Sequence, residues 1–123
     1  MPVIPAAEAA VHELHGTRFT AYAAPSRGSA ELCAWRVAVP VGTAGVPHTV
    51  TREEVLCVTS GSARVRLGDE TRVVTAGDVI VVPPGALFGL GTGEEGVTAW
   101  VTTSIGLQAT LPDGSTIAPP WTL

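Results

Sequence analysis

A histidine and a pair of carboxylates stand close together near the middle of the sequence. Glu54 follows His48 by six residues, and Glu53 directly precedes Glu54. An apolar run begins at Val55, so the histidine and one carboxylate could lie on neighbouring strands and point to one place. Neutral imidazole and carboxylate are ligands of first-row divalent metals. The same two groups are suited to acid/base catalysis, because a carboxylate can orient an imidazole whose second nitrogen then moves a proton.

Three interpretations of His48 and Glu54 remain open at this point. They could hold one divalent transition metal, serve as a catalytic acid/base pair without metal, or only satisfy each other's hydrogen bonds. Two protein ligands alone make a weak metal site, and neither His12 nor His15 can be assigned to it from the sequence. An arm folded over the barrel mouth, from the same or a partner subunit, could complete the coordination. Strand alternation lets only one of Glu53 and Glu54 face the interior.

The totals describe one globular domain. The chain has 123 residues, of which 46% are apolar and 15% are charged, and this low charged fraction predicts a large buried share. Eleven acids against seven arginines give a net charge of −4. No basic stripe is present, so nucleic acid and anionic membrane are not expected partners.

The two cysteines and the ends of the chain carry little chemistry. Cys33 and Cys57 both lie in apolar runs, which predicts two buried free thiols rather than a disulfide. Residues 1–16 read as a solvated arm with two prolines. They lack the cationic and apolar segments of a secretory signal, and no apolar run is long enough to span a bilayer, so we expect a cytoplasmic protein.

From residue 17 onward, short strands alternate with turns. Residues 31–41 place Cys33 and Trp35 on one face, which we assign to the core, and Arg36 on the other, as a solvated charge or an anion-binding group at a cavity wall. Gly68-Asp69 has the form of a two-residue hairpin turn, and residues 97–105 form the longest late strand. Strands spaced by turns every 8 to 12 residues predict an all-β sandwich or barrel over residues 17–123.

The spacing of glycines, prolines and ligand-type residues resembles the cupin family. The four residues that match the first family motif and the three that match the second are Gly42, His48, Glu54, Gly61, Gly77, Pro83 and Gly85. The resemblance implies an all-β, cupin-type double-stranded β-helix (jelly-roll) barrel. It also implies a divalent metal held in the barrel by three histidines and a glutamate, and pairing into a homodimer through barrel faces and exchanged N-terminal strands.

The sequence departs from the family pattern at the ligands. Val50 and Phe88 stand where the second and third histidines are expected, and Thr92 replaces the motif's asparagine. Only His48 and Glu54 remain as ligands, and the loss of two imidazoles lowers the expected metal affinity. The predicted pocket for a small apolar or aromatic ligand is lined by Val50, Leu56, Phe88, Arg36 and Trp100, with Trp35 as an alternative.

Two functions follow from these patterns. The first is an enzyme of bacterial secondary metabolism, a cyclase, isomerase or dioxygenase-like protein that uses His48 and Glu54 as catalytic residues, with or without a metal. The second is a non-catalytic, metal-free binding module. The retained His48 and Glu54 favour the enzyme, and Val50 and Phe88 favour the module. A regulatory partner domain is less favoured, because the chain has no DNA-binding helix pair and no charged tail.

Overall fold

The structure is a computed structural model that describes residues 2–123. Almost all of its regular structure is β. The strands are β1 (Ala10–Leu14), β2 (Thr17–Ala23), β3 (Leu32–Val39), β4 (Thr49–Val50), β5 (Glu54–Leu67), β6 (Glu70–Thr75), β7 (Val79–Val82), β8 (Phe88–Gly91), β9 (Val97–Ser104), β10 (Ala109–Thr110) and β11 (Thr116–Ile117). Short 3₁₀ helices cover Ala6–Glu8, Pro25–Arg27 and Pro120–Thr122.

The long strand β5 belongs to two sheets. Its first half pairs with β9 and β7, and its second half pairs with β6 and β8. The change occurs at Gly61, which has a φ of 77° next to a register shift between Val58 and Ser60. Only glycine adopts such a φ without strain, so the motif glycine lets the strand bend from one sheet into the other.

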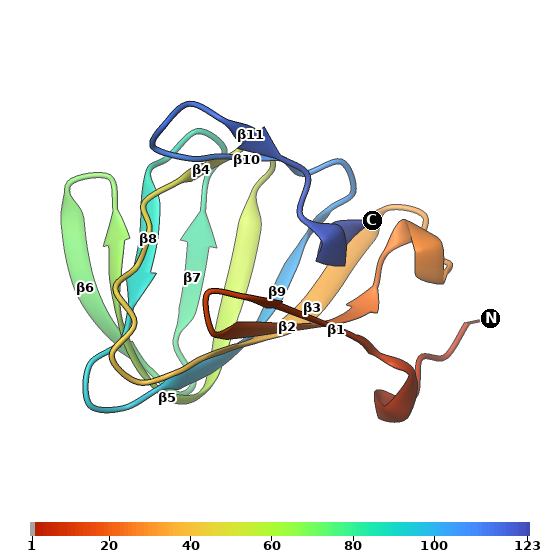
Figure 1. The fold of residues 1–123 in the computed structure, drawn as a ribbon, viewed down its shortest axis with the longest axis horizontal. Helices are drawn as coiled ribbons and strands as arrows, with labels where there is room; N and C mark the ends of the chain where they lie inside the picture. Colours follow the sequence, from red (N-terminus) through yellow and green to blue (C-terminus); the bar gives the residue numbers. More distant parts are fainter. Residues whose placement is uncertain (1) are drawn as a thin grey trace.

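The first sheet therefore contains β1, β2, β3, β9, the first half of β5, and β7. The second contains β6, the second half of β5, and β8. In Figure 1, β4, β10 and β11 lie together along the top, where they form a small three-stranded sheet. This arrangement of facing antiparallel layers confirms the predicted jelly-roll barrel.

The inner faces of the two sheets meet in one apolar core. On β3, the residues Cys33, Trp35, Val37 and Val39 are all buried, which confirms the face predicted from their alternation. The core also contains Leu56, Val58, Val65, Ile80, Val82, Phe88, Val97, Ala99 and Val101. The predicted Gly68-Asp69 turn is confirmed as well, since Leu67 and Glu70 pair directly on either side of it.

Two sequence-based expectations are wrong. Residues 1–16 are not an arm throughout, because Ala10–Leu14 forms β1 and pairs with β2 of the same chain; residue 1 lies outside the described residues. The exposed tight turn at His15 and Gly16 makes this hairpin possible. Cys57 is not buried but exposed, because β5 buries Leu56 and Val58 and alternation turns the residue between them outward.

The C-terminal segment closes the inner side of the first sheet near β1 and β2. Trp121 is buried and stacks on Phe19, with ring centroids 3.7 Å apart and planes 4° from parallel. Cys33 Sγ lies 3.4 Å from the carbonyl oxygen of Thr122. Trp121 is therefore shielded from solvent, as expected for an aromatic side chain of its size.

Candidate functional site

Glu54 is the first residue of β5 and points into the core. Its exposed fraction is 7%, whereas its neighbour Glu53 is exposed, so only one of the two carboxylates faces inward, as strand alternation predicts. In register with Glu54 are Val82 on β7 and Thr103 on β9, and both are buried. The first half of β5, in which buried and exposed residues alternate, thus places a carboxyl group in the interior.

The surroundings of Glu54 do not stabilise a charge. Its carboxyl group has no hydrogen bond within residues 2–123, and the hydroxyl of Thr103 donates instead to the backbone oxygen of Glu53, at 2.7 Å. Loss of solvation on burial therefore raises the pKa of Glu54 to about 7, because an apolar environment disfavours the ionised form. No fully buried side-chain oxygen in the described chain lacks a partner, so this carboxyl group still reaches solvent.

His48 is held on the inner face of the second sheet by its backbone. It exchanges two hydrogen bonds with Phe88, of 2.9 and 2.8 Å. Residues directly opposite each other in an antiparallel pair share a face, and Phe88 is buried. The imidazole therefore lies beside the phenyl ring, with centroids 5.6 Å apart and planes at 80°.

The imidazole is oriented by a carbonyl group rather than by Glu54. His48 Nδ1 is 3.0 Å from the backbone oxygen of Val46. A carbonyl only accepts, so Nδ1 carries the proton in this arrangement and Nε2 of the neutral ring keeps its lone pair. No hydrogen bond joins His48 and Glu54 within residues 2–123, so the predicted orientation of the imidazole by this carboxylate is wrong for this structure.

The described residues do not offer the donor set of a cupin metal centre. Val50 is 3% exposed and Phe88 is 5% exposed, and both pack in the core where the family pattern places imidazoles. Within residues 2–123, no group of three or more His, Cys, Asp or Glu side chains is arranged to hold a metal. His48 and Glu54 are the two ligands left, which does not fit the four-ligand site that the family implies.

The other predicted pocket residues divide between the two faces of the first sheet. Leu56 is buried, two residues beyond Glu54 on the same face. Arg36 and Trp100 pair in register and are both exposed, on the outer face. Their assignment to the pocket is wrong, because Trp35 and Val37 fill the inner face of β3 and alternation turns Arg36 away from it.

The remaining histidines lie apart from this arrangement. His12 on β1 is half-buried, with its ring 6.4 Å from that of Trp121. His15 is exposed in the β1–β2 turn and has a φ of 51°. Within the described chain, neither residue forms a metal-type cluster with His48 or Glu54.

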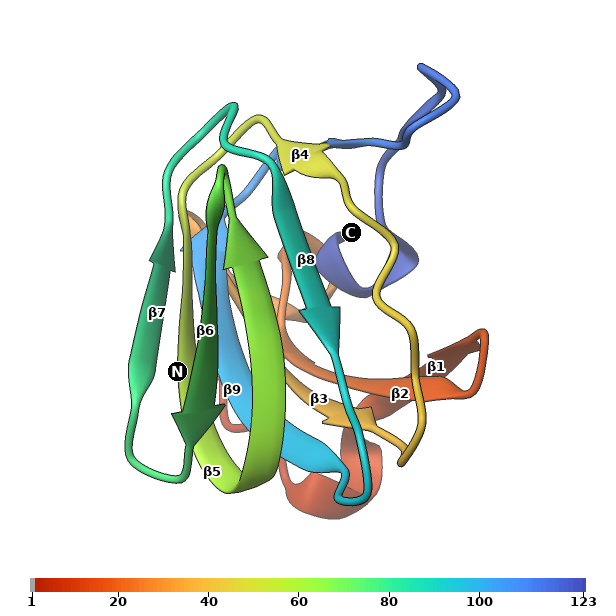
Figure 2. The same cartoon turned by 90° about the vertical axis from the view of Figure 1, so that its left-hand side faces the viewer.

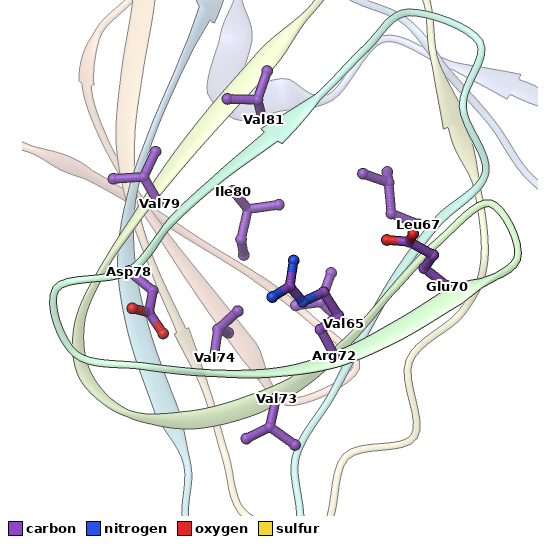
Figure 3. A pocket seen from close by; sticks show the side chains of 10 residues that line it. All are labelled: Val65, Leu67, Glu70, Arg72, Val73, Val74, Asp78, Val79, Ile80 and Val81. Atoms are coloured by element: carbon purple, nitrogen blue, oxygen red, sulfur yellow. The ribbon is translucent and has the colours of Figure 1, made fainter.

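Two cavities are lined by neither His48 nor Glu54, although the second reaches Pro47. One, of about 370 Å³, opens between β6 and β7, and Figure 3 shows the side chain of Arg72 within it. The other is a wider groove of about 750 Å³ on the outer side of β5 and β8, with Arg64 and Arg66 along it. The sequence reasoning missed Arg72. The two-residue turn at Gly68-Asp69 could have predicted this position, because it fixes the register of β5 and β6 and so places Arg72 opposite Val65.

Comparison with known proteins places this arrangement in a family. A family model described as a cupin domain matches residues 35–103. The chain belongs to the cupin family. The matched segment includes His48, Glu54 at the start of β5, and Phe88 at the start of β8. No match was found among curated proteins.

Several solved structures share the fold of this cupin. The polyketide cyclase RemF from Streptomyces resistomycificus is 20% identical, with a TM-score of 0.76 over 85% of this chain and 79% of the other. An RmlC-like cupin from Shewanella frigidimarina is 23% identical, with a TM-score of 0.69 and coverages of 80% and 85%. A putative ethanolamine utilization protein from Salmonella typhimurium is 27% identical, with a TM-score of 0.63 and coverages of 73% and 70%.

Proposed function

We propose that this cupin is an enzyme that moves protons on a small, largely apolar or aromatic compound, with Glu54 as its principal acid/base. One observation carries the proposal: Glu54 is buried among apolar residues, and burial raises its pKa to about 7. A general acid or base works best when its pKa lies near the working pH, since both protonation states are then populated.

The two retained motif residues have complementary roles in this proposal. His48 Nε2 accepts a proton, because Nδ1–H is held by the carbonyl of Val46. Protonated Glu54 supplies a proton to another atom of the ligand, such as a carbonyl oxygen. Removal of a proton at one atom and delivery at another are what an isomerisation or a cyclisation of a carbonyl compound requires.

Two further considerations favour a cyclase or an isomerase over a dioxygenase-like enzyme. Val50 and Phe88 leave two ligand positions without donors, so the donor set gives no support to metal-dependent oxygen chemistry. One structurally similar protein is named a polyketide cyclase, which supports the cyclase alternative and a place in secondary metabolism. That similarity concerns the fold.

A non-catalytic binding module is the alternative function. It is favoured by the tight packing of Val50 and Phe88 in the core, which turns the family's metal position into apolar surface. In such a module, His48 and Glu54 would contribute to binding alone. The two functions differ in whether loss of these side chains abolishes turnover or only affinity.

Proton exchange at carbon separates the two functions, whichever carbonyl compound is the substrate. A panel of small aryl ketones would be incubated in deuterium oxide with the wild-type protein, and deuterium uptake beside the carbonyl group followed by NMR. We expect Glu54→Gln and His48→Gln to slow this exchange at least about a hundredfold, while binding measured by saturation transfer persists. Glu53→Gln, which changes the exposed neighbour, is the matched control. A bound ketone that exchanges equally fast with wild type and both variants indicates the binding module.

We also propose that two chains associate through the outer face of the first sheet. Large apolar side chains are exposed there on three neighbouring strands: Val55, Val79, Val81 and Trp100. Trp100 packs beside Tyr22, with ring centroids 5.0 Å apart. Size-exclusion chromatography with light scattering should give twice the chain mass for the wild-type protein. The control Val73→Lys, on the second sheet, should also be a dimer, whereas Val81→Lys should have the mass of a single chain. A monomeric wild type, or a dimeric Val81→Lys, contradicts this interface.

No helix of the described residues is long and apolar enough to cross a membrane.

A further inference from the structure

The barrel has an opening between β6 and β7. These strands form neighbouring edges of the two sheets and are joined by the short turn that contains Gly77 (Figure 2). Each pairs with a different half of β5, and no ladder joins them to each other in the described chain. The cavity of about 370 Å³ lies at this opening, within the size range of small-molecule sites.

The inner part of this cavity is apolar. Val65 and Ile80 are buried core residues, and Leu67 and Val74 pack against the same core. Figure 3 shows these side chains around the space between the two edge strands. Hydrocarbon bound here would be removed from water on several sides, which is favourable in proportion to the apolar area covered.

An exposed cationic side chain, Arg72, lines this cavity beside the apolar residues. Arg72 pairs in register with Val65 on β5, and Figure 3 shows its side chain among the residues that line the cavity. Within residues 2–123, the one ion pair joins Arg18 and Glu13, so Arg72 has no carboxylate partner in the chain. Guanidinium offers a planar set of donors that matches a carboxylate in a two-bond arrangement.

Two carboxylates border the cavity and limit the charge that it accepts. Asp78 is held at the β6–β7 turn, where its Oδ2 accepts a hydrogen bond of 2.8 Å from the backbone N–H of Thr75. Glu70 lies at the other end, beside Leu67, in Figure 3. A ligand with one negative charge can pair with Arg72 between these ends, whereas a dianion would meet repulsion and gain nothing from the apolar walls.

We propose that the β6–β7 pocket binds a small amphipathic monocarboxylate, with its carboxylate on Arg72 and its hydrocarbon against Val65, Leu67 and Ile80. This site is separate from the acid/base function of Glu54, because the cavity is lined by neither Glu54 nor His48. Binding here therefore does not require that the protein be a catalyst.

An NMR titration of labelled protein tests this site. The probes are butanoate, hexanoate and octanoate below its micelle concentration, with octan-1-ol as the uncharged comparison. We expect shifts at the backbone amides of β6 and β7, and about fourfold tighter binding for each added methylene group, as burial of hydrocarbon predicts. Octan-1-ol should bind at least about tenfold more weakly than octanoate, because it lacks the charge-assisted pair with Arg72.

Variants test the contribution of charge. Arg72→Gln should weaken octanoate at least about tenfold and leave octan-1-ol unchanged. Arg66→Gln, on the outer face of the neighbouring strand β5, is the matched control and should bind octanoate as wild type does. Glu70→Gln should strengthen octanoate binding by removal of a nearby like charge. Absence of shifts at β6 and β7, or equal affinity of wild type and Arg72→Gln for octanoate, would overturn the proposal.

Discussion

His48 and Phe88 exchange two backbone hydrogen bonds and present their rings side by side on the inner face of the second sheet, with centroids 5.6 Å apart. The phenyl ring thus occupies the position from which the cupin motif would supply another imidazole. A metal ion bound to His48 Nε2 would therefore lack the two further imidazole ligands that the cupin motif supplies. We therefore propose acid/base chemistry at Glu54, rather than metal chemistry, as the use of this altered interior.

Restoring the missing imidazoles should create a metal site. Val50 and Phe88 share the inner face with His48, so the double substitution Val50→His and Phe88→His adds two donors beside the retained His48 and Glu54. We expect zinc or cobalt affinity to rise at least about a hundredfold over wild type, as measured by calorimetric titration. Addition of His48→Ala should reverse most of the gain. Unchanged affinity in the double variant would show that these four positions do not converge.

Glu54 should make stability depend on pH. Burial raises its pKa from 4.5 to about 7, so the folded state binds more protons than the unfolded state between these values. The stability from protonated Glu54 is fully present below pH 4.5 and is lost as pH rises through 7. The loss is about 3 kcal/mol, because one pKa unit corresponds to about 1.4 kcal/mol.

The difference between variants isolates this effect. In urea denaturation, the free energy of unfolding of Glu54→Gln relative to wild type should increase as pH rises from 4.5 to 7. The difference between Glu53→Gln and wild type should not change over this range. A constant difference between Glu54→Gln and wild type across this range would mean that Glu54 titrates normally in the fold.

Gly61 and Gly77 should respond very differently to alanine. Both have positive φ, 77° and 94°, but a Cβ on Gly61 would lie 1.8 Å from the backbone oxygen of Gly96, whereas Gly77 faces open space. Gly77→Ala should cost about 1–2 kcal/mol for the left-handed backbone alone. Gly61→Ala should cost several times more or prevent folding, as thermal unfolding would show. Similar melting temperatures for the two variants would argue against the close approach of β5 to the β8–β9 turn.

Trp121 should be a major source of stability despite its position near the C-terminus. It is 8% exposed and stacks on Phe19 at 3.7 Å. Trp121→Ala should therefore lower the free energy of unfolding by about 3–5 kcal/mol in urea titrations. Trp100→Ala, which truncates a half-exposed ring on the outer face, should cost the isolated chain less than about 2 kcal/mol. Equal losses would mean that the C-terminal turn does not close the core.

Alternation and glycine spacing made most of the fold predictable. The buried face of β3, the turn at Gly68-Asp69 and the rule that only one of Glu53 and Glu54 faces inward follow from period-two patterns and short-range turn chemistry. The pairing of β1 with β2 was not predictable, because residues 10–14 show no strong alternation. They become a strand because β2, already paired with β3, offers them a free edge. Exposed Cys57 and Trp100 were misassigned for a related reason: an apolar sequence run does not reveal that one of its faces lies on the outside.

The candidate residues His48 and Glu54 could be named from the sequence, but their geometry could not. His48 and Glu54 could be identified from motif spacing, whereas the carbonyl of Val46 as the partner of His48 depends on loop conformation between Gly45 and Thr49. The position of Arg72 depends on strand register and on the gap between two sheet edges. Such relations arise from long-range packing, which local sequence patterns do not encode.

The most direct test is the titration of the Glu54 carboxyl carbon by ¹³C NMR, with the resonance assigned by comparison with Glu54→Gln. We expect a midpoint at about pH 7, as burial of this carboxyl group requires, and the proton-exchange rate on a bound ketone should respond to pH with the same midpoint. A midpoint near the ordinary value of 4.5 would contradict the account, because Glu54 would then be fully ionised at neutral pH and unable to donate the proton assigned to it.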